Sequence, residues 1–174
     1  MTLFPAAPFG ATSAAVEARA AGVQAAEVRV TVYGAPEGAR RHRVARRGAH
    51  VVAYQSDEHR DAEGRFVAAF AAALVSMPRP VYARAVEVVI TSWHARPQRL
   101  RRKRDAGSPG LPYIGKPDAD NIAKLVMDAG TVAGLWADDT HVADLVVRRR
   151  WIPLDAESEH IGAPRVEVVV RPCS

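Results

Sequence analysis

The chain has 174 residues, 48% of them hydrophobic and 25% charged, which is a composition typical of one globular domain with its own core. It contains no apolar run of membrane-spanning length and no basic-then-apolar leader, and its one cysteine, Cys173, excludes an internal disulfide and a thiolate zinc cluster. With 24 Lys and Arg against 19 Asp and Glu, the net charge of +5 favours a polyanionic partner. The single cysteine fits a reducing compartment, and we expect a cytoplasmic protein.

The first half of the chain predicts two strands and one helix. Residues 1–26 are rich in alanine and are expected to form a loosely attached extension, so that the folded domain would span 27–174. Valines alternate with other residues over 26–34, as in a half-buried strand, and a second short strand is expected at 50–54. Between 56 and 77 apolar side chains recur at helical spacing, and two prolines end that helix.

The second half predicts one more helix and three strands around a long loop. Residues 81–93 are rich in β-branched side chains and predict a strand, whereas 95–117 contain prolines, glycines and many arginines and predict a loop. A helix is expected over 118–134, with an apolar stripe of Ile122, Leu125, Val126 and Ala129. Strands are expected over 140–152 and 164–172. We therefore predict a single α+β domain in which two main helices pack on a small mixed sheet.

Basic residues gather in three clusters, at 39–48, 95–104 and 148–150. The planar fork of arginine suits phosphate groups, so the clusters favour nucleic acid as the partner; the alternative interpretation is a set of solvated loops. The candidate DNA-binding residues are Arg40, Arg41, Arg43, Arg101, Arg102, Lys103, Arg104 and Lys116.

Carboxylates gather at both ends of the second predicted helix. Asp118 and Asp120 stand at its start, after Pro117, and Asp138 and Asp139 follow its end. One interpretation is structural, because aspartate caps helices and first-turn acids complement the helix dipole by about 0.3–1 kcal/mol each. The other is a Mg²⁺ site, which takes a few carboxylates together with water and phosphate oxygens. A helix over this stretch is roughly 24 Å long, so the sequence leaves open whether Asp139 reaches Asp118.

The stretch that begins KPDADN at residue 116 closely resembles the signature of the RusA family of Holliday junction resolvases. Its parts are an acid, any residue, Asp-Asn, a lysine four residues after the second acid, Gly-Leu-Trp and a paired Asp-Asp. The likeness covers about 116–147 without a gap, extends more loosely over most of 27–152, and implies a RusA-like fold. One departure is Gly130, where the family usually has a larger apolar residue and where glycine costs up to about 1 kcal/mol of helix propensity.

The resemblance implies a homodimeric, Mg²⁺-dependent endonuclease that nicks four-way DNA junctions symmetrically in recombination and repair, with Mn²⁺ as a substitute metal. It implies that Asp118, Asp120 and Asp139 are the essential metal-binding aspartates of the catalytic site. Lys124 corresponds to the family's essential lysine. Asp138 corresponds to the first acid of the pair and would be a further metal ligand.

Two other functions fit the same residues. In the first, the protein is a non-catalytic basic DNA-binding module whose acids only cap the helix and turn the chain. In the second, it is a Mg²⁺-dependent nuclease that acts on flaps or forks. Cleavage of a four-way junction, compared with binding alone and with cleavage of other branched DNA, separates the three.

Overall fold

A computed structural model describes residues 27–40, 43–47, 50–54, 56–75, 84–101, 110–153 and 162–173, with the backbone alone for 43–47 and 50–54. The expected N-terminal extension, residues 1–26, lies outside the described residues, as do 102–109 of the predicted basic loop. The described ranges contain the two main helices and the five strands that the sequence predicts.

Four strands form one mixed sheet in the order β1-β6-β4-β5. They are β1 (Val28–Tyr33), β4 (Val86–His94), β5 (Val142–Trp151) and β6 (Arg165–Pro172). β6 pairs antiparallel with β1 and with β4, whereas β5 lies parallel to β4. Side chains of β4 alternate between buried and half-buried, because successive residues of a strand point to opposite faces of the sheet. The mixed sheet confirms the predicted fold class.

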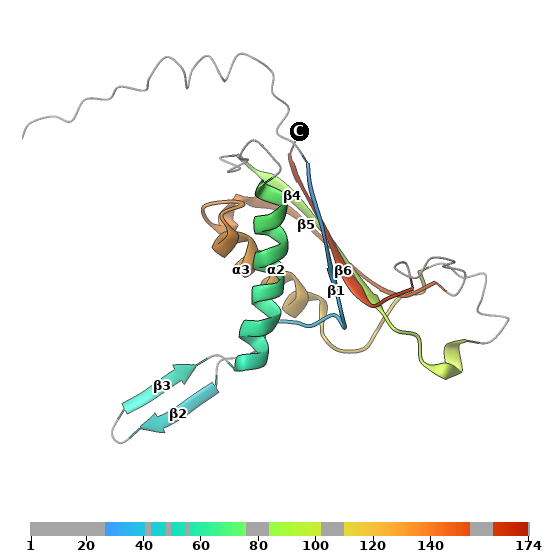
Figure 1. Ribbon diagram of the computed structural model, residues 1–174, viewed down its shortest axis with the longest axis horizontal. Helices are drawn as coiled ribbons and strands as arrows, with labels where there is room; N and C mark the ends of the chain where they lie inside the picture. Colours follow the sequence, from blue (N-terminus) through green and yellow to red (C-terminus); the bar gives the residue numbers. More distant parts are fainter. Residues whose placement is uncertain are drawn as a thin grey trace, which may run out of the picture.

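The two main helices, α2 (Asp57–Val75) and α3 (Ala119–Ala133), cover the same face of this sheet (Figure 1). The predicted apolar stripe of α3 is completely buried, and it consists of Ile122, Leu125, Val126 and Ala129. Each large apolar side chain buried in this way contributes about 1.5–3 kcal/mol to folding. None of the helices within the described ranges is both long enough and apolar enough to cross a membrane.

β4, α3 and β5 form a crossover unit that determines where the two acid pairs lie. The chain leaves β4, passes the short helix η1 (Gln98–Leu100), and returns through α3 to β5, which pairs with β4. Parallel neighbours need such a crossover, because the chain must travel back along the sheet before the second strand can begin. The start of α3 therefore lies toward the carboxyl ends of β4 and β5, and its end lies toward the beginning of β5.

β2 (Arg43–Arg47) and β3 (His50–Tyr54) form a separate two-stranded antiparallel sheet. Figure 1 shows this hairpin projecting away from the main sheet and the helices, near the beginning of α2. The sequence predicts β3 as a strand, but it places the residues of β2 in the basic cluster at 39–48 and predicts no strand there. Three of the five residues of β2 are arginine, so their residue types give no strand signal.

Candidate functional site

Asp118 occupies the N-cap position of α3 without using its side chain as a cap. Its backbone is extended (φ −73°, ψ 160°), and its carbonyl oxygen accepts a hydrogen bond from Ile122 N at 3.2 Å. A capping aspartate ordinarily accepts a hydrogen bond from an amide of the first turn, but the Asp118 carboxylate accepts none from α3. Asp118 and Asp120, which follows in the first turn, are both exposed. Both carboxylates at this helix start are thus accessible to a ligand.

Asp138, which follows the other end of α3, caps a short helix with its side chain. It is the N-cap of the short helix η3 (Asp139–His141), and its carboxylate accepts a hydrogen bond from Thr140 N at 3.0 Å. Hydrogen bonding with Thr140 lowers the pKa of Asp138 below its ordinary value. Asp139 is exposed as well, and it is not the residue that caps the turn. Of this pair, Asp139 is therefore the acid more available to a ligand.

The two acid pairs lie toward opposite ends of α3, which separates Asp118 from Asp139. α3 has 15 residues and is about 22 Å long. Gly115, just before the first acid pair, is hydrogen-bonded to Arg149 near the end of β5, whereas Asp139 precedes the start of β5 at Val142. Along a strand, the distance from Val142 to Arg149 is about 23 Å. Accordingly, no three His, Cys, Asp or Glu residues within the described ranges form a group that could hold a metal ion.

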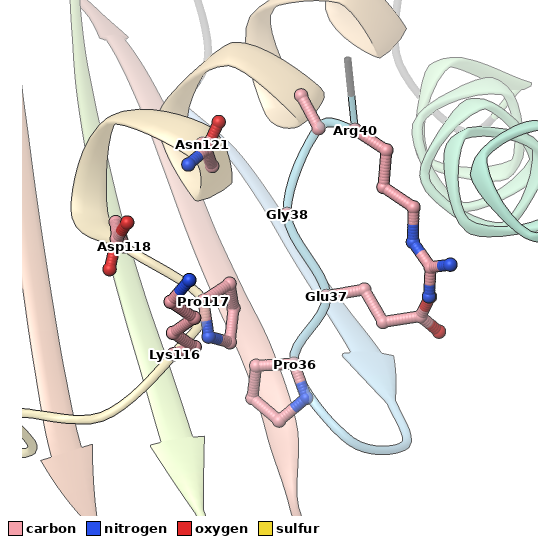
Figure 2. Close-up of a pocket in the computed structure, with 9 residues that line it drawn as sticks. Pro36, Glu37, Gly38, Arg40, Lys116, Pro117, Asp118 and Asn121 are labelled. Atoms are coloured by element: carbon pink, nitrogen blue, oxygen red, sulfur yellow. The ribbon is translucent and has the colours of Figure 1, made fainter. Parts of the chain in front are cut away.

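An open pocket of about 500 Å³ lies beside Asp118, between residues 36–40 and the start of α3 (Figure 2). The backbone of 36–40 passes very close to the helix. A Cβ atom at position 38 would lie 2.8 Å from Asn121 Cβ and 2.9 Å from Pro117 Cβ, so this approach requires Gly38. The pocket is therefore formed by the packing of two chain segments that are far apart in the sequence.

Charged residues of both signs line this pocket. Asp118 and Lys116 come from the wall that leads into α3, and Glu37 and Arg40 come from the opposite wall. Glu37 and Arg40 each form an ion pair with a residue of α2. Lys116 is exposed and forms no ion pair within the described part of the chain, so it is the cation in the pocket that is available to an anionic ligand.

A family model for the endodeoxyribonuclease RusA matches residues 34–171, which contain both acid pairs and the pocket. The chain belongs to the RusA family. It is a crossover junction endodeoxyribonuclease, as the resemblance at 116–147 implies. No curated protein matches the sequence at a significant level.

The predicted DNA-binding residues of this RusA-family enzyme are only partly described. Lys116 and Arg40 line the pocket, and the Arg40 guanidinium donates a hydrogen bond to Glu58 at 3.0 Å. Arg101 is exposed, with its Nε donating to the carbonyl oxygen of Arg96 at 3.1 Å. For Arg43 the structure gives the backbone alone. Four other predicted residues lie outside the described residues: Arg41, Arg102, Lys103 and Arg104.

Lys124 and Asp120 stand one turn apart on the exposed side of α3. That spacing suits a surface ion pair, as expected if Asp120 has only a structural role. Among the ion pairs of the described residues, however, none joins Asp120 to Lys124. The lysine is thus not neutralised by this acid, and it remains a candidate for contact with phosphate.

Sequence reasoning misses Arg149, which it places in a basic cluster at 148–150. In the structure its side chain is half-buried, and one Nη donates to the carbonyl oxygens of Tyr113 at 3.0 Å and Gly115 at 2.7 Å. A signal for this exists in the sequence, because alternate residues of a strand share a face. Arg149 lies two residues after Val147 in β5, so the two side chains share a face of the sheet. Val147 packs against the core, and the Arg149 side chain therefore points to the helix-covered face.

A second missed residue is His94, at the end of β4. It is 6% exposed, and its Nε2 lies 3.1 Å from Ser92 Oγ. Burial, and then the nearby positive charge of Arg149, lower the pKa of His94 to about 4. The imidazole is therefore neutral at physiological pH, and it adds no charge to this end of the sheet.

Proposed function

We propose that the enzyme resolves four-way DNA junctions by paired, symmetric nicks that depend on a divalent cation, in recombination and repair. The observation that carries this proposal is the start of α3. Two exposed carboxylates stand there, one of them without a capping bond, beside a pocket lined by Lys116, which pairs with no acid among the described residues. We also propose that the enzyme acts on its DNA substrate in the cytoplasm, as expected from the sequence.

Asp118 and Asp120 fit the hard oxygen ligands that Mg²⁺ and Mn²⁺ take, because both carboxylates are exposed at one end of α3. A bound ion of this kind would activate water and polarise the phosphodiester. Lys124, one turn along the same helix, would stabilise negative charge that develops on the phosphate. Lys116 would hold the DNA backbone at the pocket beside these acids.

The third predicted ligand, Asp139, stands about one helix length away from Asp118 in the same chain. The proposed homodimer offers a way to complete the site, because a second copy brings its own Asp139 to the assembly. A two-fold axis would then place two equal sites on a junction that itself has approximate two-fold symmetry. Asp138 has a weaker claim to the metal, since Thr140 already engages its carboxylate.

The basic clusters would hold the arms of the junction. Arg40 and Arg41 precede β2, Arg43 begins it, and the hairpin of β2 and β3 projects from the body of the molecule (Figure 1). A projecting two-stranded ribbon rich in arginine suits contact with a DNA backbone or groove. The loop at 95–117, which contains Arg101, Arg102, Lys103 and Arg104, would contact a second arm.

The test is the nicking of a synthetic four-way junction, compared with a fork, a flap and a linear duplex, in Mg²⁺, Mn²⁺ and EDTA. We expect paired nicks at symmetric positions in the junction, in either metal, and no nicks in EDTA. Asp120→Asn should lower the nicking rate more than about 100-fold while it leaves junction binding intact. Loss of a residue that only hydrogen-bonds to a metal ligand costs about 10- to 100-fold, and loss of a ligand itself should cost more. Asp144→Asn, at an exposed acid of β5, is the matched control and should nick normally.

Four outcomes would contradict the proposal. Equal cleavage of forks and flaps would assign a broader nuclease of branched DNA. Cleavage in EDTA, or normal cleavage by Asp120→Asn, would remove the metal and the acids from the mechanism. Binding without cleavage in any metal would leave a DNA-binding member of the family without nuclease activity.

A further inference from the structure

The segment 110–117, which leads into the acid pair at the start of α3, is fixed along the end of β5. Trp151 N donates to the carbonyl oxygen of Leu111 at 2.8 Å, and Tyr113 N donates to that of Arg149 at 3.0 Å. Between them an antiparallel bridge joins Pro112 to Arg150. The segment thus continues the sheet by a short stretch before it turns toward α3.

Arg149 adds a second attachment from its side chain. One Nη donates to both the Tyr113 and the Gly115 carbonyl oxygens, and the guanidinium carbon lies 5.3 Å from the centroid of the Tyr113 ring. Its Nε is buried and has no hydrogen-bond partner within the described residues. The hydrogen bonds of this half-buried cation are therefore made to the backbone of 110–117, which fixes the segment in two places.

Tyr113 extends this attachment toward the acid pair. Its ring stacks on the neutral ring of His94, with centroids 3.6 Å apart and an interplanar angle of 3°, and it meets Trp151 edge-on at 4.7 Å. Its hydroxyl donates to the carbonyl oxygen of Lys116. A Cβ atom at position 115 would lie 2.5 Å from the Tyr113 hydroxyl oxygen, so a larger residue at this position would displace the Tyr113 ring.

We propose that Arg149 is a positioning residue for the nuclease site: by holding the carbonyl groups of Tyr113 and Gly115, it sets the place of Asp118 at the start of α3. The inference rests on the proposed function, in which Asp118 binds the divalent cation. Only Lys116 and Pro117 separate Gly115 from Asp118, so a displacement at Gly115 is passed on to the carboxylate. A misplacement of about 1 Å near a reacting group costs up to roughly 100-fold in rate.

The experiment measures the Mg²⁺ concentration for half-maximal junction nicking, kcat, and junction Kd in EDTA for four variants. Arg149→Gln should raise the Mg²⁺ midpoint about 10-fold and lower kcat by about 10- to 100-fold, with junction Kd within twofold of wild type. Arg149→Lys should recover part of the loss, because an ammonium keeps the charge without the fork geometry. Tyr113→Phe, which removes only the hydrogen bond to Lys116, should shift the midpoint in the same direction by less. Arg171→Gln removes an exposed arginine of β6 as the charge-matched control and should leave the midpoint unchanged.

The Mg²⁺ midpoint distinguishes positioning from general stability, since a partly unfolded enzyme loses active molecules without changing the affinity of those that remain. A folded Arg149→Gln with wild-type midpoint and kcat, while Asp120→Asn is inactive, would overturn this inference alone. A fully active Asp120→Asn would instead overturn the proposed function. If Arg149→Gln does not fold, Arg149→Lys and Tyr113→Phe decide, and a wild-type midpoint in both overturns the inference.

Discussion

At the scale of the residue, two aspartates with the same backbone position have different tasks. Asp118 and Asp138 are both N-caps with extended backbone, at ψ 160° and ψ 152°. The carboxylate of Asp138 accepts the hydrogen bond from Thr140 N, whereas that of Asp118 accepts no capping bond. A capping side chain contributes about 0.5–2 kcal/mol to its helix, and α3 forgoes this at Asp118. The Asp118 carboxylate is therefore left free for the cation binding that we propose.

The buried His94 predicts a dependence of stability on pH. The pKa of His94 is about 4 in the folded protein and 6.5 in its ordinary state, so between these values the unfolded chain binds a proton that the folded chain does not. The stability that the neutral ring contributes is fully present above pH 6.5 and is lost as the pH falls toward 4. The loss is on the order of 3 kcal/mol. Urea unfolding at pH 7.5, 6, 5 and 4.5 measures it.

His94→Gln provides the comparison, because glutamine keeps a polar side chain without a titration in this range. The variant should be less stable at pH 7.5, since it loses the stack on Tyr113, but its free energy of unfolding should fall less steeply toward pH 4.5. Identical slopes for the variant and the wild-type enzyme would show that His94 does not titrate abnormally.

At this scale the sequence predicts the acids of the proposed site but not Arg149, which we propose positions one of them. Asp118, Asp120 and Lys124 stand out because their spacing forms a motif. Arg149 carries a charge that composition assigns to the surface, and its task depends on a contact with Gly115, 34 positions away in the chain. A contact of that kind is fixed by tertiary packing, which no local pattern encodes.

At the scale of the element, apolar periodicity predicts both main helices and all four strands of the main sheet within a few residues. The stripe of α3 is predicted position by position, because a helix packed on a sheet must bury one face. β2 is missed because pairing with β3, rather than its own residue types, makes it a strand. β4 begins at Val86, whereas the sequence predicts a strand that begins at residue 81. Residues 81–83 lie outside the described ranges.

Gly130 illustrates how packing reverses a propensity argument. Alanine at a helix interior is favoured over glycine by about 1 kcal/mol, so helix propensity alone predicts that Gly130→Ala stabilises α3. A Cβ atom at position 130, however, would clash with Trp136 Cζ2, and Trp136 is 1% exposed with its Nε1 donating a hydrogen bond to Thr131 Oγ1. We expect Gly130→Ala to lower the free energy of unfolding by about 1–3 kcal/mol, measured by urea denaturation.

Gly64 in α2 is the matched control for this prediction. A Cβ atom there would meet no atom within 4 Å, so Gly64→Ala adds helix propensity without a clash. This variant should be more stable than wild type by about 0.5–1 kcal/mol. If Gly130→Ala were stabilising by the same amount, Trp136 would have to lie elsewhere than the structure places it.

At the scale of the whole molecule, the parallel pairing of β4 and β5 decides whether one chain completes the predicted metal site. The sequence predicts both strands and the helix between them, but not that they are parallel neighbours. Once they are, the helix must run back along the sheet, and Asp139 falls at the opposite end of α3 from Asp118. Asp139 thus belongs to the same family signature as Asp118 and Asp120 but lies far from both in the fold of one chain.

The proposed dimer makes this separation testable by mixing two inactive variants. If each site combines Asp118 and Asp120 of one copy with Asp139 of the other, a mixed dimer of Asp120→Asn and Asp139→Asn contains one site with both mutations and one site with none. Mixing the two variants, with subunit exchange allowed, should therefore restore nicking of one junction strand per dimer, up to about a quarter of the wild-type rate for a random mixture. The measurement is the yield of single nicks in a labelled junction.

Sites built within single chains give the opposite result, because every site in the mixed dimer would then carry one mutation. The matched control mixes Asp118→Asn with Asp120→Asn, whose mutations fall in the same half of the proposed shared site. That mixture leaves no intact site under either arrangement and should stay inactive. Restored nicking in the first mixture alone would establish that Asp139 acts across the dimer, and its absence in a confirmed mixed dimer would contradict the shared site.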